Sequence, residues 1–285
     1  MITKRLFFRT LSPTQEKVLK ALATYKFLTT WQLLRLGIMT ERANLNKQIS
    51  ELRIWRNPLL GSVAFGVHPK LWKLESVHHL THHGAGIIKD YLDINHPIRF
   101  PKTNAVLFQQ DYFHRIHTVD VHISLQERAF QNSNSVEMLF FLPYFDKVSS
   151  GKNHGYRSES YIPLSENDYL IADALCMLQT STRKELYAVE LYNGNDTKRV
   201  HQSLLHHLKA LSVGQPSKMF GLDYGSRVLC IFELEVYKQM AMKRLFLDKN
   251  FAEAKSHFLF KSLEEVKQNV FEGWWLFDVN KVNLF

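Results

Sequence analysis

The chain has 285 residues, of which 45% are hydrophobic and 22% are charged, and it carries a formal net charge of +9. This composition is that of a globular protein and excludes a largely disordered chain. No uncharged apolar run reaches the ~18 residues that a membrane-spanning helix needs, and the basic N-terminus lacks the apolar stretch of a secretory signal. Cys176 and Cys230 lie in apolar runs, so we expect buried free thiols and a cytoplasmic location.

The positive charge is concentrated at one end of the chain. Residues 1–75 contain 13 Lys and Arg against 4 Asp and Glu, and the remainder is neutral. Such a concentration is typical of a surface that neutralises DNA phosphates. A solvated or membrane-facing basic surface would have the same composition, so the pattern of the residues has to decide.

Three short helices are predicted near the N-terminus. Ser12-Pro13 with Gln15 has the spacing of a capping box at a helix start, and apolar residues recur behind it at helical spacing. Thr29 is a suitable cap for a second helix that runs through Leu36 and is closed by Gly37. A third helix is expected from near Thr40, with its core residues at Leu45, Ile49 and Leu52.

The outer face of the third helix has the side chains of a major-groove reader. Arg suits guanine edges, Asn and Gln suit adenine edges, and Lys suits phosphates. The alternation of apolar residues from Ser62 to Leu74, around Gly66 and Pro69, predicts a two-stranded wing. A packing helix is expected after Thr81. The predicted DNA-binding residues are Arg42, Asn44, Lys47, Gln48, Arg53, Lys70 and Lys73. The alternative is an ordinary three-helix core with a solvated basic face.

Histidines at 78–79 and 82–83 resemble ligand pairs. No cysteine partner and no HExxH spacing accompanies them, which favours surface or helix-start histidines over a zinc site. After them, residues 94–104 contain Pro97 and Pro101 and read as a linker, so a domain boundary is predicted between residues 1–96 and 105–285.

The larger C-terminal part is predicted to contain a mixed sheet. A helix is expected from about Phe108 to Phe130, and it contains the stretch from His114 to Asp120. Strands are expected at 170–178, 185–192 and 227–236, with a helix at 197–211 between the last two. A hairpin, a crossover helix and a further strand imply an α/β core, α+β over the whole chain. By itself, the 108–130 helix would be a buried helix with polar edges.

Two of the predicted strands each carry one carboxylate in an apolar setting, Asp173 and Glu190. A lone buried carboxylate is costly unless it is paired or binds a cation, and hairpin pairing can bring these two together. Two carboxylates with room for phosphate oxygens and water form a typical Mg²⁺ or Mn²⁺ site. The alternative is an edge hairpin whose carboxylates face water.

Side-chain periodicity places further candidates near this pair. The period of two along a strand puts Glu190 and Tyr192 on one face. On the following helix, Lys198, Gln202 and His206 recur at i, i+4 and i+8 and share one side. Lys198 is therefore predicted to reach the metal site as a cation that stabilises phosphorane charge, the alternative being a solvated helix residue.

The order of these predicted elements and motifs along the chain resembles that of the replication-relaxation family, which includes the MobC-class relaxases of mobilizable plasmids. The N-terminal likeness lies in Leu11-Ser12-Pro13-Thr14-Gln15, residues 26–33 and residues 80–85. In the second part it lies in His114 with Asp120, then Asp173, then Val189-Glu190. A different relaxase class needs a His-hydrophobe-His triad, and no such tripeptide occurs.

The resemblance implies a winged helix-turn-helix followed by a restriction-endonuclease-like PD-(D/E)xK domain. Carried over, Asp173 and Glu190 would be the metal carboxylates, and His114 and Asp120 would lie beside them. Tyr192 occupies the position of the lysine in the PD-(D/E)xK motif. Three alternatives follow: Lys198 supplies the missing positive charge, Tyr192 attacks the DNA itself and forms a transient covalent link, or the site is inactive. Attack by water is favoured, because nothing near Tyr192 lowers its pKa.

Three functions follow. The first is a site-specific, metal-dependent nickase at a plasmid or mobile-element origin of transfer or replication, acting on double-stranded DNA with relaxosome or coupling proteins as further partners. The second is a non-catalytic DNA-binding accessory protein of replication or transcription. The third is a double-strand endonuclease of a restriction or transposition system. The nickase is the leading expectation.

Overall fold

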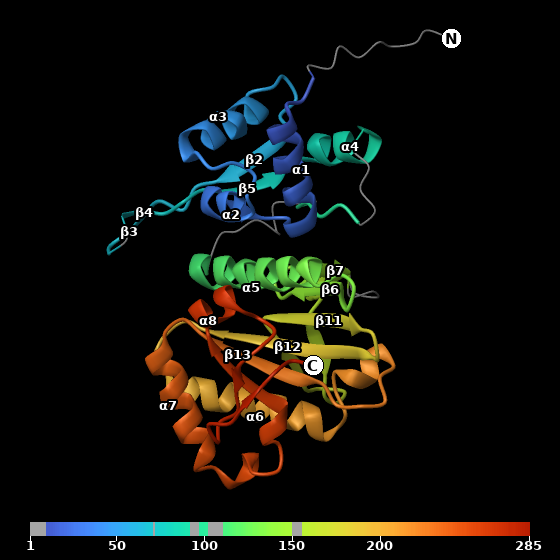
Figure 1. The fold of residues 1–285 in the computed structure, drawn as a ribbon, viewed down its shortest axis with the longest axis vertical. Helices are drawn as coiled ribbons and strands as arrows, with labels where there is room; N and C mark the ends of the chain where they lie inside the picture. The colour runs from blue at the N-terminus through green and yellow to red at the C-terminus, as the bar shows by residue number, and fades with distance from the viewer. Residues whose placement is uncertain (1–9, 71, 92–96, 102–110, 150–155) are drawn as a thin grey trace. The chain divides into compact units, whose positions relative to one another are not determined.

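The computed structural model describes residues 10–70, 72–91, 97–101, 111–149 and 156–285. The chain divides into two compact units, Met1–Tyr112 and Phe113–Phe285. Within the described residues there are eight α-helices, a seven-stranded mixed sheet and several small sheets, which confirms a mixed α/β protein (Figure 1). None of the described helices combines the length and the apolar character needed to cross a bilayer. The predicted linker at 94–104 falls mostly outside the described residues.

The N-terminal unit contains short helices and short strands. Its helices are α1 (Pro13–Tyr25), α2 (Thr30–Arg35), α3 (Arg42–Arg53) and α4 (His82–Tyr91). Its strands are β1 (Leu28–Thr29), β2 (Leu60–Val63), β3 (Val67–His68), β4 (Trp72–Lys73) and β5 (Val77–Leu80).

The predicted caps of the first two helices are confirmed. Ser12 accepts from the backbone N–H of Gln15, and the Gln15 side chain accepts from the N–H of Ser12. The same reciprocal box joins Thr29 and Gln32 at the start of α2. Gly37, which follows α2, has a φ of 67°, a backbone conformation that glycine adopts without strain. Local sequence therefore determines where these two helices begin.

Helix α3 begins two residues later than predicted, after Glu41, which makes no side-chain capping bond. Its three predicted core residues, Leu45, Ile49 and Leu52, are all buried. They recur at helical spacing and pack inward, so the opposite face is left to polar side chains. The division into an apolar inner face and a polar outer face is as predicted.

The predicted wing is part of a longer hairpin. Strand β5 lies between β1 and β2 in an antiparallel sheet, with Leu60 opposite Leu80 and Val63 opposite Val77. Beyond it, β3 and β4 pair with each other in a separate two-stranded sheet. The prediction of two strands is confirmed, but Trp72 is 80% exposed rather than packed on a core. Leu71, another residue of the predicted pattern, lies outside the described residues.

Helix α4 confirms the helix predicted after Thr81. The hydroxyl of Thr81 accepts from the N–H of Gly84 and donates to the carbonyl of Pro58. Gly84 lies so close to the chain that a Cβ there would be 2.1 Å from the carbonyl oxygen of Leu59. Only glycine permits this approach between the helix and the start of β2.

The C-terminal unit is built around the large sheet. Its helices are α5 (Tyr112–Gln131), α6 (Thr197–Ser212), α7 (Glu235–Phe246) and α8 (Leu263–Gln268), with 3-10 turns η2 (Ser217–Phe220), η3 (Lys249–Phe251) and η4 (Lys255–His257). The large sheet contains β6 (Val136–Pro143), β11 (Ala174–Thr180), β12 (Lys184–Tyr192), β13 (Arg227–Phe232), β14 (Phe258–Ser262), β15 (Trp274–Trp275) and β16 (Lys281–Val282). The small strands are β7 (Lys147–Ser149), β8 (Tyr156–Ser158), β9 (Tyr161–Pro163) and β10 (Tyr169–Ile171).

The order of strands in the large sheet is β16-β15-β14-β13-β12-β11-β6. Strands β6, β11 and β12 form an antiparallel meander, and β13 and β14 run parallel to β12. One face packs against α5 and α8, and the other packs against α6 and α7 (Figure 1). The two cysteines, Cys176 and Cys230, are buried and unpaired, as predicted.

Some predicted boundaries in this unit are wrong. The single strand expected at 170–178 is interrupted at Ala172 and Asp173, and its first part, β10, pairs with β9 outside the large sheet. The strand predicted at 227–236 ends at Phe232, because α7 begins at Glu235. Helix α5 agrees with the predicted helix from residue 112 onward, and residues 108–110 lie outside the described residues. The strands at 185–192 and the helix at 197–211 are confirmed.

Candidate active site

The two predicted carboxylates lie close together at one end of the meander. In the antiparallel register of β11 and β12, Ala174 is opposite Val189, so Asp173 lies at the level of Glu190. Asp173 lies in the interruption immediately before β11, whereas Glu190 lies inside β12. The juxtaposition expected from hairpin pairing is therefore present.

Asp173 is held from two sides. One carboxylate oxygen, Oδ1, lies 2.7 Å from Nε2 of His114 on α5. The other, Oδ2, accepts from the backbone N–H of Leu191 on β12 at 2.7 Å. A helix and a strand thus fix the orientation of the carboxylate before any ligand binds. The Asp173 side chain keeps 16% of its surface exposed, so it is within reach of solvent.

Glu190 lies deeper than Asp173. Its Oε1 is 2.7 Å from Nε2 of His207 on α6, and its Oε2 accepts from the hydroxyl of Ser203 at 3.3 Å. Burial, together with the negative charge of Asp173, raises the pKa of Glu190 above its ordinary value. The site therefore contains two carboxylates that repel each other, each already held by one histidine.

Tyr192, at the lysine position of the motif, is not placed as a nucleophile. Its ring is buried against Phe232, and its hydroxyl donates to Ser203 at 3.2 Å. Burial and the charge of Glu190 raise its pKa well above 10. A phenol in this setting stays protonated at neutral pH, and direct attack on DNA by this oxygen is disfavoured.

The prediction that Lys198 reaches the carboxylates is not met. Lys198, Gln202 and His206 share one side of α6, as their spacing predicted, but that side is exposed. Within the described residues, Lys198 makes no hydrogen bond or ion pair with Asp173 or Glu190. The helix carries its apolar residues toward the sheet, and a side chain on the opposite face cannot point at a strand beneath it.

Two residues of α6, Ser203 and His207, were missed by the sequence reasoning. They lie on the inner face together with Val200 and Leu204. The signal was present in the sequence: His207 follows Val200 by seven residues and Leu204 by three, the spacing of one helix face. A polar residue within an apolar stripe is the feature that would have identified it.

Asp120 does not lie beside the other carboxylates, and this part of the prediction is wrong. Its carboxylate is buried, and Nζ of Lys267 on α8 lies 3.0 Å from it. His114 and Asp120 are six residues apart on α5, which places them on different faces of the helix. Asp120 is thus part of the packing between α5 and α8.

The donor chemistry of the acidic pair suits a hard divalent cation, because carboxylate oxygens are the preferred ligands of Mg²⁺ and Mn²⁺. Such an ion would also offset the burial and the repulsion from Asp173 that together raise the pKa of Glu190. Among the described residues, no group of three or more His, Cys, Asp or Glu side chains is arranged to hold a metal. A cation bound here would need phosphate oxygens or water to complete its coordination.

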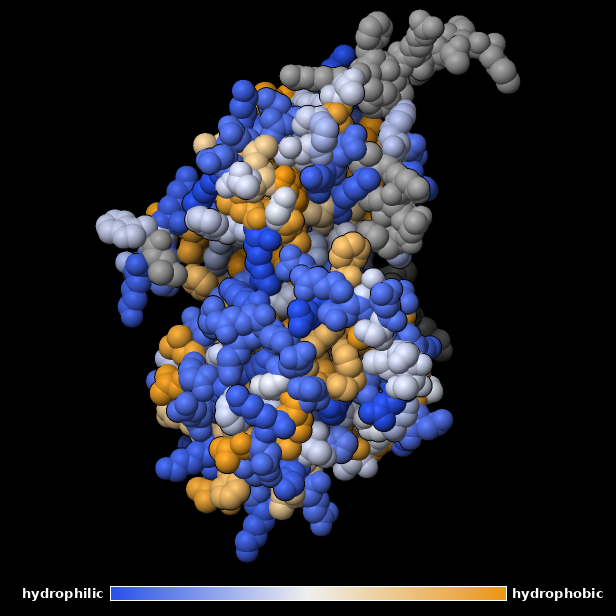
Figure 2. Space-filling view, in the orientation of Figure 1, coloured by the Kyte–Doolittle hydropathy of each residue, from blue (hydrophilic) through white to orange (hydrophobic). Residues whose placement is uncertain are grey.

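A second candidate site is the outer face of α3 in the N-terminal unit. Asn44, Lys47 and Arg53 are exposed there, and the surface over α3 is mainly hydrophilic (Figure 2). The other two predicted residues are partly engaged within the unit. Arg42 pairs with Glu75 and lies 4.9 Å over the ring of Trp31, and Gln48 accepts from the hydroxyl of Ser12 at 3.0 Å.

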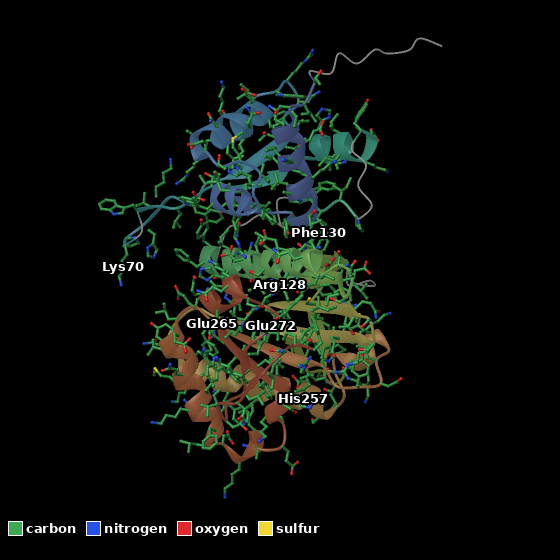
Figure 3. All side chains as sticks on the ribbon, in the orientation of Figure 1. Lys70, Arg128, Phe130, His257, Glu265 and Glu272 are labelled. Atoms are coloured by element: carbon green, nitrogen blue, oxygen red, sulfur yellow. The ribbon has the colours of Figure 1, made fainter. Side chains whose placement is uncertain are left out.

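The two predicted lysines of the hairpin are exposed. Lys70 lies in the turn between β3 and β4 and points away from the rest of the N-terminal unit (Figure 3). Lys73 is on β4, beside Trp72. The histidine pairs have different surroundings: His78 is buried between Thr30 and Ser62, whereas His82 and His83 are exposed on α4.

Comparisons of the chain with protein-family models, curated proteins and solved structures found no match. The likeness to the replication-relaxation family therefore rests on the sequence motifs alone.

Proposed function

We propose that this chain is a site-specific, metal-dependent DNA nickase that acts at an origin of transfer or replication. The observation that carries the proposal is the juxtaposition of Asp173, which immediately precedes β11, and Glu190, on the adjacent strand β12, each held by a histidine. Two fixed, mutually repelling carboxylates are an arrangement that favours cation binding, and a divalent cation next to a phosphodiester is a common means of cutting DNA.

In this proposal, Asp173 and Glu190 hold a Mg²⁺ or Mn²⁺ ion. When bound, such an ion polarises the scissile phosphate and lowers the pKa of a water molecule. His114 orients Asp173, and His207 with Ser203 orients Glu190. Asp173 is the more exposed of the two carboxylates, so the phosphate would approach from its side.

The N-terminal unit is proposed to recognise the DNA site. Helices α1, α2 and α3, the three-stranded sheet and the β3–β4 hairpin support the winged-helix interpretation. Asn44, Lys47 and Arg53 on α3 would face the major groove, and Lys70 and Lys73 would contact phosphates from the hairpin. The excess of positive charge in this part of the sequence agrees with that role.

The proposal is tested with supercoiled plasmid that carries the DNA around the protein's own gene, incubated with Mg²⁺ or Mn²⁺. We expect open circles from the unaltered chain and none from Asp173→Asn, which keeps the shape of the side chain but removes its charge. Asp223→Asn is the matched control, since Asp223 is an exposed acid of the same unit. EDTA should abolish the nicking. Linear product would instead indicate a double-strand endonuclease.

A non-catalytic DNA-binding accessory protein is the second candidate. It is favoured by one observation: among the described residues, no lysine or arginine is hydrogen-bonded to Asp173 or Glu190, and the lysine position of the motif is Tyr192. Tight binding to cognate DNA with no metal-dependent cut would establish this candidate and reject the nickase.

A further inference from the structure

Beside Asp173, the two short strands β9 and β10 present tyrosines to solvent. Their antiparallel register places Ile171 opposite Tyr161 and Tyr169 opposite Pro163. Ile162 and Leu170 alternate with these residues and are buried. One face of the small sheet is therefore anchored in the core, and the other face carries the aromatic rings.

The two rings form a stack with a cation on it. The ring centroids of Tyr161 and Tyr169 are 5.0 Å apart, with planes inclined by 28°. The guanidinium of Arg157, on β8, lies 5.4 Å from the centre of the Tyr161 ring. Tyr169 remains 52% exposed, so much of its ring surface is available. We call Tyr161, Tyr169 and Arg157 the tyrosine platform.

Ser160, the residue before Tyr161, is hydrogen-bonded to the residue before Asp173. The hydroxyl of Ser160, the residue before Tyr161, donates to the carbonyl of Ala172 at 2.5 Å, and the N–H of Ala172 donates to the carbonyl of Ser160 at 3.3 Å. Tyr161 is opposite Ile171, the last residue of β10, and Asp173 follows Ile171 by two residues. The backbone bonds between Ser160 and Ala172 therefore hold β9 next to the residue that precedes Asp173.

The charges around the platform favour a polyanion over an apolar partner. Strand β7 pairs with β8, and in their register the residue opposite Arg157 is the uncharged Val148, so no acid of β7 is paired with this guanidinium. Asp168, the acid adjacent to Tyr169, is neutralised by an ion pair with Lys209. Cations next to exposed aromatic rings are the combination that binds single-stranded nucleic acid, because bases stack on the rings while phosphates contact the cations.

We propose that the tyrosine platform stacks an unpaired base of single-stranded DNA and so holds the strand beside Asp173. This inference rests on the proposed function and names its substrate as a locally melted strand. In a duplex, neighbouring bases already cover each base face, so an intact helix offers the platform nothing to stack on. The platform thereby selects one strand after the duplex has opened.

The test measures binding of fluorescein-labelled dT20 and of a 20-base-pair duplex to the full chain by anisotropy, in EDTA. We expect Tyr169→Ala to weaken binding of dT20 about tenfold and to leave duplex binding unchanged. Tyr169→Phe, which keeps the stacking surface, should bind dT20 within about threefold of the unaltered chain. Phe246→Ala is the matched control, since it removes an exposed aromatic ring from α7. The thermal unfolding midpoint of each variant verifies folding.

Equal binding of dT20 by Tyr169→Ala and the unaltered chain overturns the platform, and so does an equal loss with Phe246→Ala. The nickase proposal fails separately. If the platform binds dT20 as expected but Asp173→Asn and the unaltered chain leave plasmid uncut, the strand-binding role stands and the cutting role falls. If the unaltered chain nicks plasmid but Tyr169→Ala binds dT20 as tightly as the unaltered chain, the cutting role stands and the strand-binding role falls.

Discussion

His207 and Glu190 form a pair that is almost completely excluded from solvent: 2.7 Å separates Nε2 from Oε1, and only 2% and 8% of the two side chains are exposed. The pair joins α6 to the centre of the large sheet. A buried carboxylate without its partner is unstable, so the fold and the candidate site depend on the same contact.

We therefore expect His207→Ala to lower the free energy of unfolding by about 3 kcal/mol, because it leaves Glu190 buried without its imidazole partner. Urea denaturation measures the change. The neighbouring His206→Ala provides the control, since His206 is exposed on the same helix and its loss should change stability by less than about 0.5 kcal/mol. Equal effects of the two variants would contradict the role assigned to the buried pair.

Stability should depend on pH through His78. Burial first, then the charges of Arg53 and His79, lowers its pKa from 6.5 to about 4. Between these values the unfolded chain binds a proton that the folded chain does not, so stability is lost as the pH falls from about 6.5 toward 4, by about 3 kcal/mol. Denaturation at several pH values should show this slope. His78→Gln should flatten it, and His83→Gln, at an exposed position, should leave it intact.

Lys47 should contribute to DNA affinity through phosphate contact. If so, Lys47→Ala weakens binding at low salt and reduces the slope of log K against log salt concentration by about 1. Titrations at several salt concentrations measure that slope. Lys20→Ala removes an exposed lysine from α1 of the same unit and should leave the slope unchanged. An identical slope for Lys47→Ala and the unaltered chain would remove Lys47 from the proposed interface.

Tyr192→Phe should nick DNA at close to the normal rate, with no covalent DNA–protein product in either case. The hydroxyl is buried, donates to Ser203 and has a raised pKa, so it is poorly suited to attack. Denaturing gels of reactions with end-labelled DNA detect both the cut and any link. A labelled protein band that disappears in Tyr192→Phe would instead establish a tyrosine nucleophile.

Asp120→Asn should affect stability and not cutting. The Asp120–Lys267 pair joins α5 to α8 away from Asp173, and Lys267 is about one-third exposed, so solvent screens the interaction. We expect a loss of about 1 kcal/mol in urea denaturation and an unchanged nicking rate per folded molecule. A rate as low as that of Asp173→Asn would return Asp120 to the active site.

Local signals in the sequence were sufficient to predict where the first two N-terminal helices begin. The capping boxes at Ser12 and Thr29 depend on contacts between residues three apart, and α1 and α2 begin where these boxes place them. The pairing of Asp173 with Glu190 was also accessible, because a hairpin fixes register over a short stretch. In each case the determining contact is close in sequence.

The remaining features depend on contacts between distant residues. The predicted strand at 170–178 is broken at Ala172 and Asp173, because β10 pairs with β9 and not with the large sheet. The hydropathy of residues 170–178 gives no sign of this break. Lys198 was predicted from the side of the helix that it shares with Gln202 and His206, but it is the side with Val200 and Leu204 that packs against the sheet. The small strands from β7 to β10 are each three residues long, too short to give a periodic pattern.

The connections that hold the acidic pair have a consequence for synthesis of the chain. Asp173 is paired with His114, 59 residues earlier in the chain, and Glu190 is paired with His207, 17 residues later. A ribosome must therefore release the chain beyond residue 207 before both carboxylates can be oriented. The N-terminal unit, Met1–Tyr112, emerges well before that point. The basic N-terminal part of a nascent chain is thus outside the ribosome while its acidic pair is still unassembled.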